Sequence, residues 1–193
     1  MNHNTIQIRP ARASDQRAVA PLIVQALDDL AAKYTNSNDP LNLIPDVSLF
    51  FVQEKNMYSY VQTLVAETGH RVVGSITAYD GADFILFRNP FIQHVSRKYG
   101  FNLPLEPETE AGEYYIDTLS VIPFQQGKGI GAALIRAMLQ HAVALKYERV
   151  GLLVEAANAP AKKLYGRIGF KKAGEKQLLK SSYEHLVFDL ADL

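Results

Sequence analysis

The segment that decides the fold is Val121-Ile122-Pro123-Phe124-Gln125-Gln126-Gly127-Lys128-Gly129-Ile130-Gly131-Ala132. A strand-forming run precedes the turn and an apolar helical pattern follows it, which predicts a strand, a glycine-rich turn and a helix. Glycine lets the backbone approach a ligand closely and adopt positive φ. The free N–H groups and the macrodipole at the start of the helix favour an anion, and Lys128 adds positive charge. We therefore expect a phosphate or pyrophosphate here, or else a tight turn in which the glycines serve packing alone.

Two known phosphate-binding patterns do not fit this loop. In Gly127-x-Gly129-x-Gly131 the third glycine comes one residue too early for the dinucleotide fingerprint. Gly129 follows Lys128 at the position where a P-loop has serine or threonine. A protein that binds a nucleotide phosphate through this same loop stays open as an alternative.

The surrounding sequence alternates between strand and helix patterns. Downstream, we expect a helix at residues 130–145, an apolar strand at 150–154, a short helix at 158–168 and a terminal strand at 187–190. Upstream, we expect a strand at 6–8, helices at 15–33 and 47–61, a hairpin with strands at 63–67 and 71–79, a short helix at 91–99 and a strand at 113–121. This alternation predicts an α/β fold with a mixed sheet.

Length and composition narrow the class of protein. The chain has 193 residues, which is typical of one domain. Lysine plus arginine equals aspartate plus glutamate at 20 each, and this balance argues against binding nucleic acid by phosphate neutralisation. There is no cysteine, so thiolate metal sites and cysteine nucleophiles are excluded. No apolar run is long enough to span a bilayer, and residues 1–10 lack the apolar stretch of a signal peptide, so we expect a cytoplasmic protein without a membrane partner.

Several motifs together resemble one family. The loop reads Gln126-x-x-Gly129-x-Gly131, and the strand before it reads Tyr115-Ile116-Asp117-Thr118-Leu119-Ser120-Val121-Ile122-Pro123. A later segment, from Asn158 to Phe170, has the pattern N-x-x-A-x-x-L-Y-x-x-x-G-F. With the opening Ile8-Arg9-Pro10-Ala11, these segments resemble the GNAT superfamily of acyl-CoA-dependent N-acetyltransferases. The resemblance covers most of the chain as a single acetyltransferase domain over residues 1–193, and residues 81–112 depart from it as an insert.

The resemblance implies a fold and a binding site for a cosubstrate. The fold is a mixed, strongly twisted, mostly antiparallel sheet with helices on both faces and splayed central strands. Acetyl-CoA would lie between the splayed strands, with its thioester and pantetheine beside Leu119 and Val121 and its pantetheine region beside Asn158. The pyrophosphate would meet the N–H groups of a run of loop residues, namely Gln126, Gly127, Lys128, Gly129, Ile130, Gly131 and Ala132. Tyr165 would face the thiolate sulfur.

Acetyl transfer to an amine needs a proton acceptor for the amine and a proton donor for the thiolate. Glu113, Tyr115, Asp117 and Leu119 alternate along one strand, so we expect them to share a face directed into the cleft. Asp117 or Glu113 is then a candidate general base, and Tyr165 a candidate acid. The structural alternatives are that Asp117 satisfies a strand end, that Glu113 is solvated at the start of the strand, and that Tyr165 packs in the core.

Other polar and aromatic residues leave alternatives open. The histidines show no metal-ligand spacing, so we expect no metal. The aromatic residues of the 81–112 insert fit a substrate lid, a dimer contact or a satellite core. The acidic run Glu106-Pro107-Glu108-Thr109-Glu110 either attracts a cationic acceptor or is a solvated loop. Lys162 and Lys163 either meet the adenosine phosphates or form a solvated helix face.

The sequence therefore predicts an N-acetyltransferase that moves an acetyl group from acetyl-CoA directly to a primary amine of a small molecule or peptide. No covalent enzyme intermediate is expected, because the chain has no cysteine and no pattern marks an activated serine. The alternative is a noncatalytic acyl-CoA-binding sensor or regulatory module, which would keep the glycine loop without depending on Asp117, Glu113 or Tyr165. A homodimer is compatible with either hypothesis.

Overall fold

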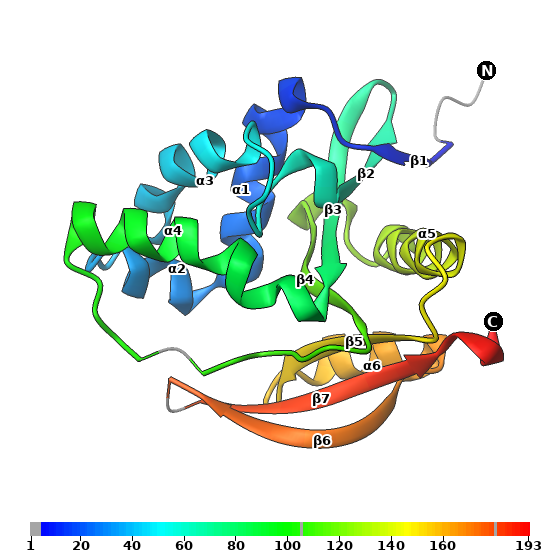
Figure 1. Ribbon diagram of the computed structural model, residues 1–193. Coiled ribbons are helices and arrows are strands. Elements are labelled where there is room, and N and C mark those ends of the chain that lie inside the picture. The colour runs from blue at the N-terminus through cyan, green and yellow to red at the C-terminus, as the bar shows by residue number, and fades with distance from the viewer. Residues whose placement is uncertain (1–4, 105, 180) are drawn as a thin grey trace.

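The computed structural model describes residues 5–104, 106–179 and 181–193 and contains one seven-stranded sheet with the order β1-β2-β3-β4-β5-β7-β6 (Figure 1). The strands are β1 (Gln7–Pro10), β2 (Thr63–Thr68), β3 (Arg71–Asp80), β4 (Tyr114–Val121), β5 (Arg149–Glu155), β6 (Lys171–Leu178) and β7 (Ser181–Asp189). Only β4 and β5 are parallel; every other neighbouring pair is antiparallel. The expected mixed, mostly antiparallel sheet is confirmed. Residues 1–4, part of the segment in which we expect no signal peptide, lie outside the described residues.

Helices cover both faces of the sheet. One face carries α1 (Gln16–Leu27), α2 (Asp29–Tyr34), α3 (Ile44–Phe51) and α4 (Phe84–Tyr99), and the other carries α5 (Ile130–Ala144) and α6 (Ala159–Ile168) (Figure 1). Each face has its own hydrophobic core. The α1-side core includes Ile23, Phe51 and Phe91. The α5-side core includes Leu134 and Leu152. No helix in the described part of the chain is long and apolar enough to cross a membrane.

The two central strands separate soon after they meet. β4 and β5 pair at three positions, from Tyr114 with Val150 to Ile116 with Leu152. Beyond Ile116, β4 continues to Val121 beside β3 alone. The expected splay between the central strands is therefore present, and it opens a space at the middle of the sheet.

A β-bulge lies at the point of separation. Ala78 of β3 pairs with Ile116, and Thr77 pairs with Thr118, so Asp117 is an extra residue in β4. The bulge changes the alternation of side chains: Tyr115 packs in the α1-side core, whereas Leu119 packs against the α5-side core. The expectation that Leu119 shares a face with Glu113, Tyr115 and Asp117 is wrong, because one extra residue moves every later side chain to the opposite face.

Several predicted element boundaries are also wrong. The helix expected at residues 15–33 is interrupted at Asp28, whose φ of 49° ends α1 and lets α2 begin in a new direction. The helix expected at 47–61 ends at Phe51, and the helix expected at 91–99 begins seven residues earlier, at Phe84. β6 was not predicted, because its alternation of charged and small residues is typical of an exposed edge strand rather than an apolar one.

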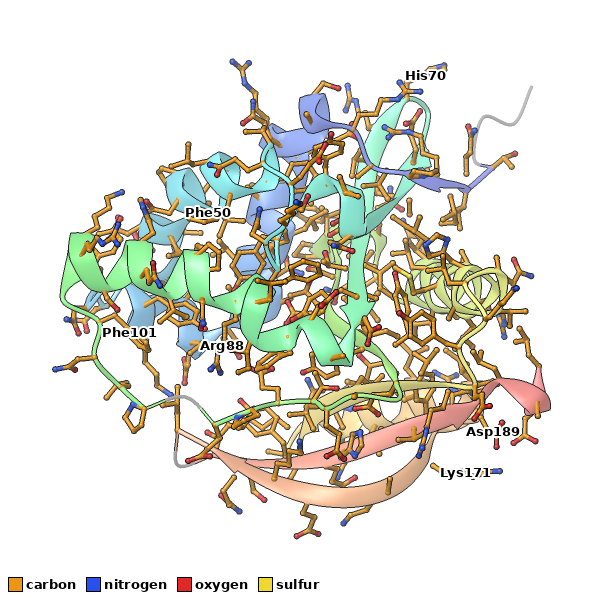
Figure 2. All side chains as sticks on the ribbon, viewed as in Figure 1. Phe50, His70, Arg88, Phe101, Lys171 and Asp189 are labelled. Atoms are coloured by element: carbon orange, nitrogen blue, oxygen red, sulfur yellow. The ribbon has the colours of Figure 1, made fainter. Side chains whose placement is uncertain are left out.

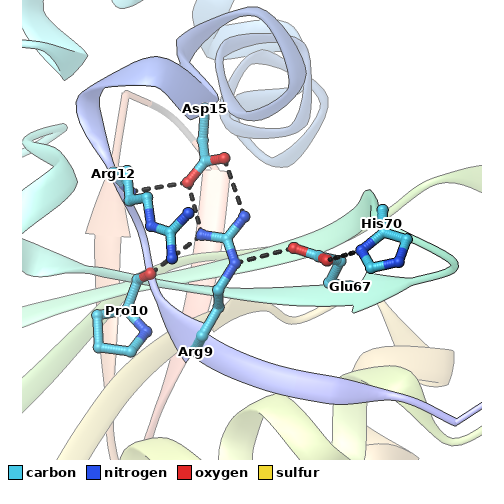
Figure 3. A network of polar contacts seen from close by, with 6 residues as sticks. All are labelled: Arg9, Pro10, Arg12, Asp15, Glu67 and His70. Atoms are coloured by element: carbon cyan, nitrogen blue, oxygen red, sulfur yellow. Dashed lines mark hydrogen bonds and ion pairs between the residues drawn. The ribbon is translucent and has the colours of Figure 1, made fainter.

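The amino-terminal strand is fixed to the first helix by a polar network (Figure 3). Arg9 donates to Asp15 at 2.8 and 3.0 Å and to Glu67 of β2 at 2.9 Å. Asp15 also accepts a hydrogen bond from the Arg12 backbone N–H at 2.7 Å. The network joins β1, β2 and the start of α1, and so fixes the position from which α1 crosses the sheet.

Several aromatic residues of the 81–112 segment, which we expect to be an insert, pack in the protein core. Phe84, Phe91 and Phe101 are buried in the α1-side core. Of the three interpretations left open for this segment, their burial fits the one in which its aromatic residues form part of a core. After α4, the chain returns to β4 through residues 100–113. Arg88 of α4, labelled in Figure 2, donates to the Glu106 carbonyl at 3.1 Å, and Lys176 of β6 donates to the Glu108 carbonyl at 2.9 Å. These contacts hold the returning loop across the splayed strands.

Candidate active site

A groove of about 690 Å³ lies where β4 meets α5 and α6. We call it the glycine-loop groove, and its lining includes all but one of the predicted cofactor-binding residues: Leu119, Val121, Gln126, Gly127, Gly129, Ile130, Gly131, Ala132, Asn158 and Tyr165. Lys128 is not among the lining residues, and its ammonium donates to the exposed Gln125 side chain at 3.0 Å. Residues from three separate sequence motifs thus meet in one groove.

The backbone of β4 directs hydrogen-bonding groups toward this groove. Ile122 N–H donates to the Val73 carbonyl, and hydrogen-bonded pairs alternate along an antiparallel ladder. The backbone groups of Leu119 and Val121 therefore point away from β3, toward the open side of β4. Two side-chain amides reach the Val121 carbonyl, from Gln25 of α1 at 3.0 Å and from Gln126 at 2.9 Å. Gln25 comes from a segment that the sequence motifs did not include.

The glycine loop has the backbone geometry that its sequence predicts. Gly127 and Gly129 have φ of 74° and 82°, a region that other residues rarely adopt. A side-chain Cβ at Gly129 would meet no atom within 4 Å, so this glycine serves the backbone turn and not close packing within the chain. The turn leads directly into α5, whose first N–H groups lack carbonyl partners within the helix.

Two arginines give the groove positive charge. Arg136 of α5 and Arg167 of α6 both line it. Neither arginine was among the expected phosphate contacts, for which Lys162 and Lys163 were the candidates. Lys162 forms an ion pair with Glu184 at 3.2 Å. The helical spacing of Arg136 from Ala132, four residues earlier, could have identified it, since residues about one turn apart share a helix face. The groove combines free N–H groups with cations, which is the chemistry that binds phosphates.

Asn158 and Tyr165 have different roles in building the groove. The Asn158 side chain caps α6 by accepting from Ala161 N–H at 3.1 Å. Tyr165 is 8% exposed and packs edge-on against Phe170 at 5.7 Å. Burial raises the pKa of Tyr165 to about 12, so the phenol keeps its proton at neutral pH. A protonated phenol beside the groove can donate a hydrogen bond or a proton.

A second cavity, of about 170 Å³, lies on the α1 side of the splayed strands. We call it the acidic cavity. Six carboxylates line it, and they come from the junction of α1 and α2, the returning loop, β4 and β5: Asp28, Asp29, Glu106, Glu108, Asp117 and Glu155. Four tyrosines also line it: Tyr34, Tyr58, Tyr115 and Tyr183. Lys33 is the one basic residue among the lining residues that the structure describes.

Asp117 lies at the inner end of the acidic cavity, on the bulge of β4. Tyr79 donates to its Oδ1 at 3.0 Å, and its Oδ2 is buried without a hydrogen-bond partner. Burial raises the pKa of Asp117 well above its usual range; the negative charge of Glu108 raises it further, and the hydrogen bond from Tyr79 opposes the shift. A carboxylate with a raised pKa is a stronger proton acceptor than an ordinary aspartate.

Glu108 also belongs to this site, although the sequence shows residues 106–110 as one acidic run and does not single it out. Its carboxylate accepts from Tyr115 at 2.8 Å. Burial raises the pKa of Glu108, while the hydrogen bond from Tyr115 and the charges of Arg88 and Lys176 lower it. The solvated-loop interpretation is therefore wrong for Glu108, because the fixed backbone of the returning loop directs this side chain inward.

Glu113 lies apart from both cavities. Thr109 donates to its Oε1 at 2.6 Å, and His185 Nε2 lies 3.0 Å from its Oε2. Burial raises the pKa of Glu113, but the hydrogen bonds from His185 and Thr109 outweigh burial and hold the pKa below its usual value. The carboxylate covers Gly151, where a Cβ would collide with it. Glu113 thus joins β4, β5, β7 and the returning loop.

The chain was compared with known proteins. The model of the acetyltransferase (GNAT) family matches residues 25–170. A mycothiol acetyltransferase of Actinosynnema mirum is 34% identical over 51% of this chain and 28% of its own length. A spermine/spermidine N(1)-acetyltransferase of Bacillus subtilis is 32% identical over 40% of this chain and 51% of its own length. The chain thus spans between about a quarter and a half of these two curated relatives.

Solved structures match over nearly the whole chain. An N-acetyltransferase from Staphylococcus aureus is 26% identical with a TM-score of 0.81, over 94% of this chain and all of the other. A Salmonella typhimurium protein, solved with its cofactor acetyl-CoA, is 19% identical with a TM-score of 0.61, over 97% and 95% of the two chains, and supports the fold alone. Because the family model covers the glycine loop, β4 and α6, the chain belongs to the GNAT acetyltransferase family.

Proposed function

We propose that this protein transfers an acetyl group from acetyl-CoA directly to a primary amine. The observation that carries the proposal is the position of β4 between two cavities. The glycine-loop groove, with its free N–H groups and two arginines, suits the pyrophosphate and pantetheine of acetyl-CoA. The acidic cavity, with Asp117 at its inner end, suits an amine that approaches from the other side. The acetyl group then lies at the splay, beside the free backbone groups of Leu119.

Each chemical step has a candidate residue. A primary alkyl ammonium has a pKa near roughly 10.4 and must lose a proton before it attacks. Asp117 accepts that proton, directly or through water, and the amine nitrogen bonds to the acetyl carbon. The backbone N–H of Leu119 stabilises the negative oxygen that forms. The carbon–sulfur bond then breaks, and Tyr165 donates its proton to the leaving thiolate. We assign Glu113 a structural role in place of a catalytic one, since its carboxylate is already bound by Thr109 and His185.

The relatives are named for different acceptors, mycothiol for some and spermine for others, so the choice of acceptor by this chain depends on its own cavity. The acidic cavity, at about 170 Å³ against about 690 Å³ for the glycine-loop groove, favours a small amine over a peptide that needs a long open groove. We place the reaction in the cytoplasm, since a chain without cysteine suits a reducing compartment that also supplies acetyl-CoA.

The test is an acetyl-CoA assay with a panel of small amines. Released CoA is measured with a thiol reagent, which has no background from the protein because the chain contains no cysteine. Turnover that depends on the amine, and an acetylated product identified by mass, are the expected results. Tight CoA binding with no acetylation of any amine would instead favour the noncatalytic sensor. CoA displaced by ATP at similar concentration would favour the nucleotide binder.

A further inference from the structure

The carboxylates of the acidic cavity form two groups at different depths. Asp117 and Glu108 are partly buried at the inner end, where Tyr79 and Tyr115 donate to them. Asp28, Asp29, Glu106 and Glu155 are exposed at the rim. Proton removal from one amine needs one inner carboxylate, so the rim carboxylates exceed what the proposed acetyl transfer uses.

The rim carboxylates share the acidic cavity with an aromatic side chain. Tyr183 of β7 lines the cavity, and burial together with the charges of Glu155, Glu108, Asp28 and Asp29 raises its pKa. Tyr183 thus lines the same cavity as carboxylates from the α1–α2 junction, the returning loop and β5. Within the described residues, no lysine or histidine forms an ion pair with any of the six carboxylates of the cavity. Negative charge beside an aromatic face is suited to a cation.

Two buried polar atoms provide an independent observation at the inner end. Asp117 Oδ2 and the Tyr58 hydroxyl are both buried without a well-formed hydrogen bond, and both residues line the cavity. Burial raises the pKa of Tyr58, and Tyr34, which also lines the cavity, has its hydroxyl close enough to raise that pKa further. Tyr58 is fully buried. Leaving such atoms unpaired costs free energy, so they fit a ligand that can donate several hydrogen bonds at once. An ammonium group has three N–H donors and a positive charge, whereas a neutral hydroxyl has one donor.

We propose that the acceptor is a small compound with two amino groups: its reacting nitrogen lies beside Asp117 and Tyr58, and its second, still protonated nitrogen lies against Asp28, Asp29 and Glu155 at the rim. This inference rests on the proposed acetyl transfer. The break between α1 and α2 is what places Asp28 and Asp29 at the rim, since a continuous helix would carry them in another direction. The second amine is a specificity contact and takes no part in bond making.

The proposal is tested with pairs of acceptors that differ by one charge. Linear diamines with chains from propane to hexane are each compared with the amino alcohol of the same length, in which a hydroxyl replaces one amine. We expect the best diamine to exceed its amino alcohol by at least about tenfold in kcat/KM, which corresponds to about 1.4 kcal/mol. High salt should reduce this preference, because the rim carboxylates are exposed and screened.

A double variant tests the rim. Asp28→Asn combined with Asp29→Asn keeps side-chain shape, and asparagine tolerates the positive φ of residue 28. We expect kcat/KM for the diamine to fall about tenfold, with a loss of less than about threefold for the amino alcohol. Glu148→Gln combined with Asp192→Asn is the matched control, because it removes two exposed charges that line no part of the acidic cavity and should leave both substrates unaffected. A preference for diamines that persists in the rim variant would overturn the assignment.

A binding measurement separates this inference from the proposed function. Calorimetry of diamine and amino alcohol against the protein saturated with CoA needs no turnover. Equal binding and equal turnover of the two acceptors would overturn the diamine proposal and leave acetyl transfer intact. Selective binding of the diamine, lost in the rim variant, supports charge recognition; if no amine were then acetylated, the proposed function would fail instead. Faster acetylation of an uncharged peptide amino terminus than of any diamine would also overturn the proposal.

Discussion

The glycine-loop groove and the acidic cavity lie on opposite sides of β4 but are built differently. The groove is formed by two short segments, at residues 119–136 and 158–168, and Gln25 of α1 donates to the Val121 carbonyl at its edge. The cavity takes its lining from six segments between residues 26 and 183. Local segments carry motifs that can be recognised, whereas distant segments meet only through the fold. The glycine-loop groove, which would bind a shared cosubstrate, is thus encoded by local segments. The acidic cavity, which would choose the acceptor, is not.

Asp117→Asn tests the acidic cavity most strongly. An amide cannot accept the amine proton, so kcat/KM should fall by about 10² to 10⁴ at neutral pH, with CoA affinity unchanged. Raising the pH should restore part of the activity, because more of the amine is then deprotonated. Steady-state kinetics and calorimetry measure the two quantities. A loss smaller than about tenfold in both Asp117→Asn and Glu113→Gln would show that no side-chain base should be assigned.

Gly129→Glu tests the glycine-loop groove, where we expect a loss of CoA affinity. It forces a side chain into positive φ and places a negative charge where phosphate is expected, so CoA affinity should fall by about 100-fold or more. Gly174→Glu on β6 is the matched control, since a Cβ there also meets no atom within 4 Å and it lines neither cavity. Unchanged affinity in Gly129→Glu would mean that the loop is only a turn.

Tyr165→Phe tests whether the groove contributes to chemistry as well as binding. The thiolate is a good leaving group, so loss of the proton donor should lower kcat by about tenfold, with little change in CoA affinity. Pre-steady-state kinetics establish that chemistry limits the rate. Full turnover under that condition would return Tyr165 to a packing role beside Phe170.

Glu113→Gln should affect stability more than catalysis. We expect kcat/KM to change by less than about tenfold and the free energy of unfolding to fall by about 1 to 3 kcal/mol, because buried hydrogen bonds to Thr109 and His185 weaken. The folded pKa of Glu113 is below its usual 4.5, so its stabilisation is complete above about pH 4.5 and is lost as pH falls through the folded value. Thermal melts between neutral and acidic pH measure this, and a large loss of kcat/KM alone would exchange the roles of Glu113 and Asp117.

The smallest effects are two opposite shifts in the pH profile. Because the pKa of Asp117 is raised, the acid limb of kcat/KM should lie above that of an ordinary aspartate. Glu108→Gln removes a charge that raises this pKa and should move the limb to lower pH. Tyr79→Phe removes a hydrogen bond that lowers it and should move the limb to higher pH. Shifts in the same direction would contradict the arrangement of these three side chains.

Sequence reasoning succeeded where the structure is local. The strand before the loop, the positive φ of Gly127 and Gly129, and the short helix α6 are set by neighbouring residues, and they appear where predicted to within a residue. Lys128 is the one expected cofactor-binding residue of the loop that does not line the groove, and its side chain donates to Gln125. The roles of Asp117 and Tyr165 stay predictions.

Sequence reasoning failed where a distant partner decides the geometry. The bulge at Asp117 depends on pairing with β3, so the reversed face of Leu119 could not be read from the alternation within β4. Glu106 and Glu108 have similar sequence surroundings, but only Glu108 is turned inward to accept from Tyr115. The break at Asp28 also lies inside a run with continuous helical periodicity.

The break at Asp28 has a consequence for how new acceptors could be selected in the laboratory. It joins α1, whose Gln25 contacts the glycine-loop groove, to α2, which belongs to the acidic cavity. Substitutions at residues 28–30 can reshape the rim while the glycine loop keeps its backbone. Directed evolution toward other amines should therefore accumulate changes at this helix junction and at residues 106–108, and leave residues 126–132 untouched.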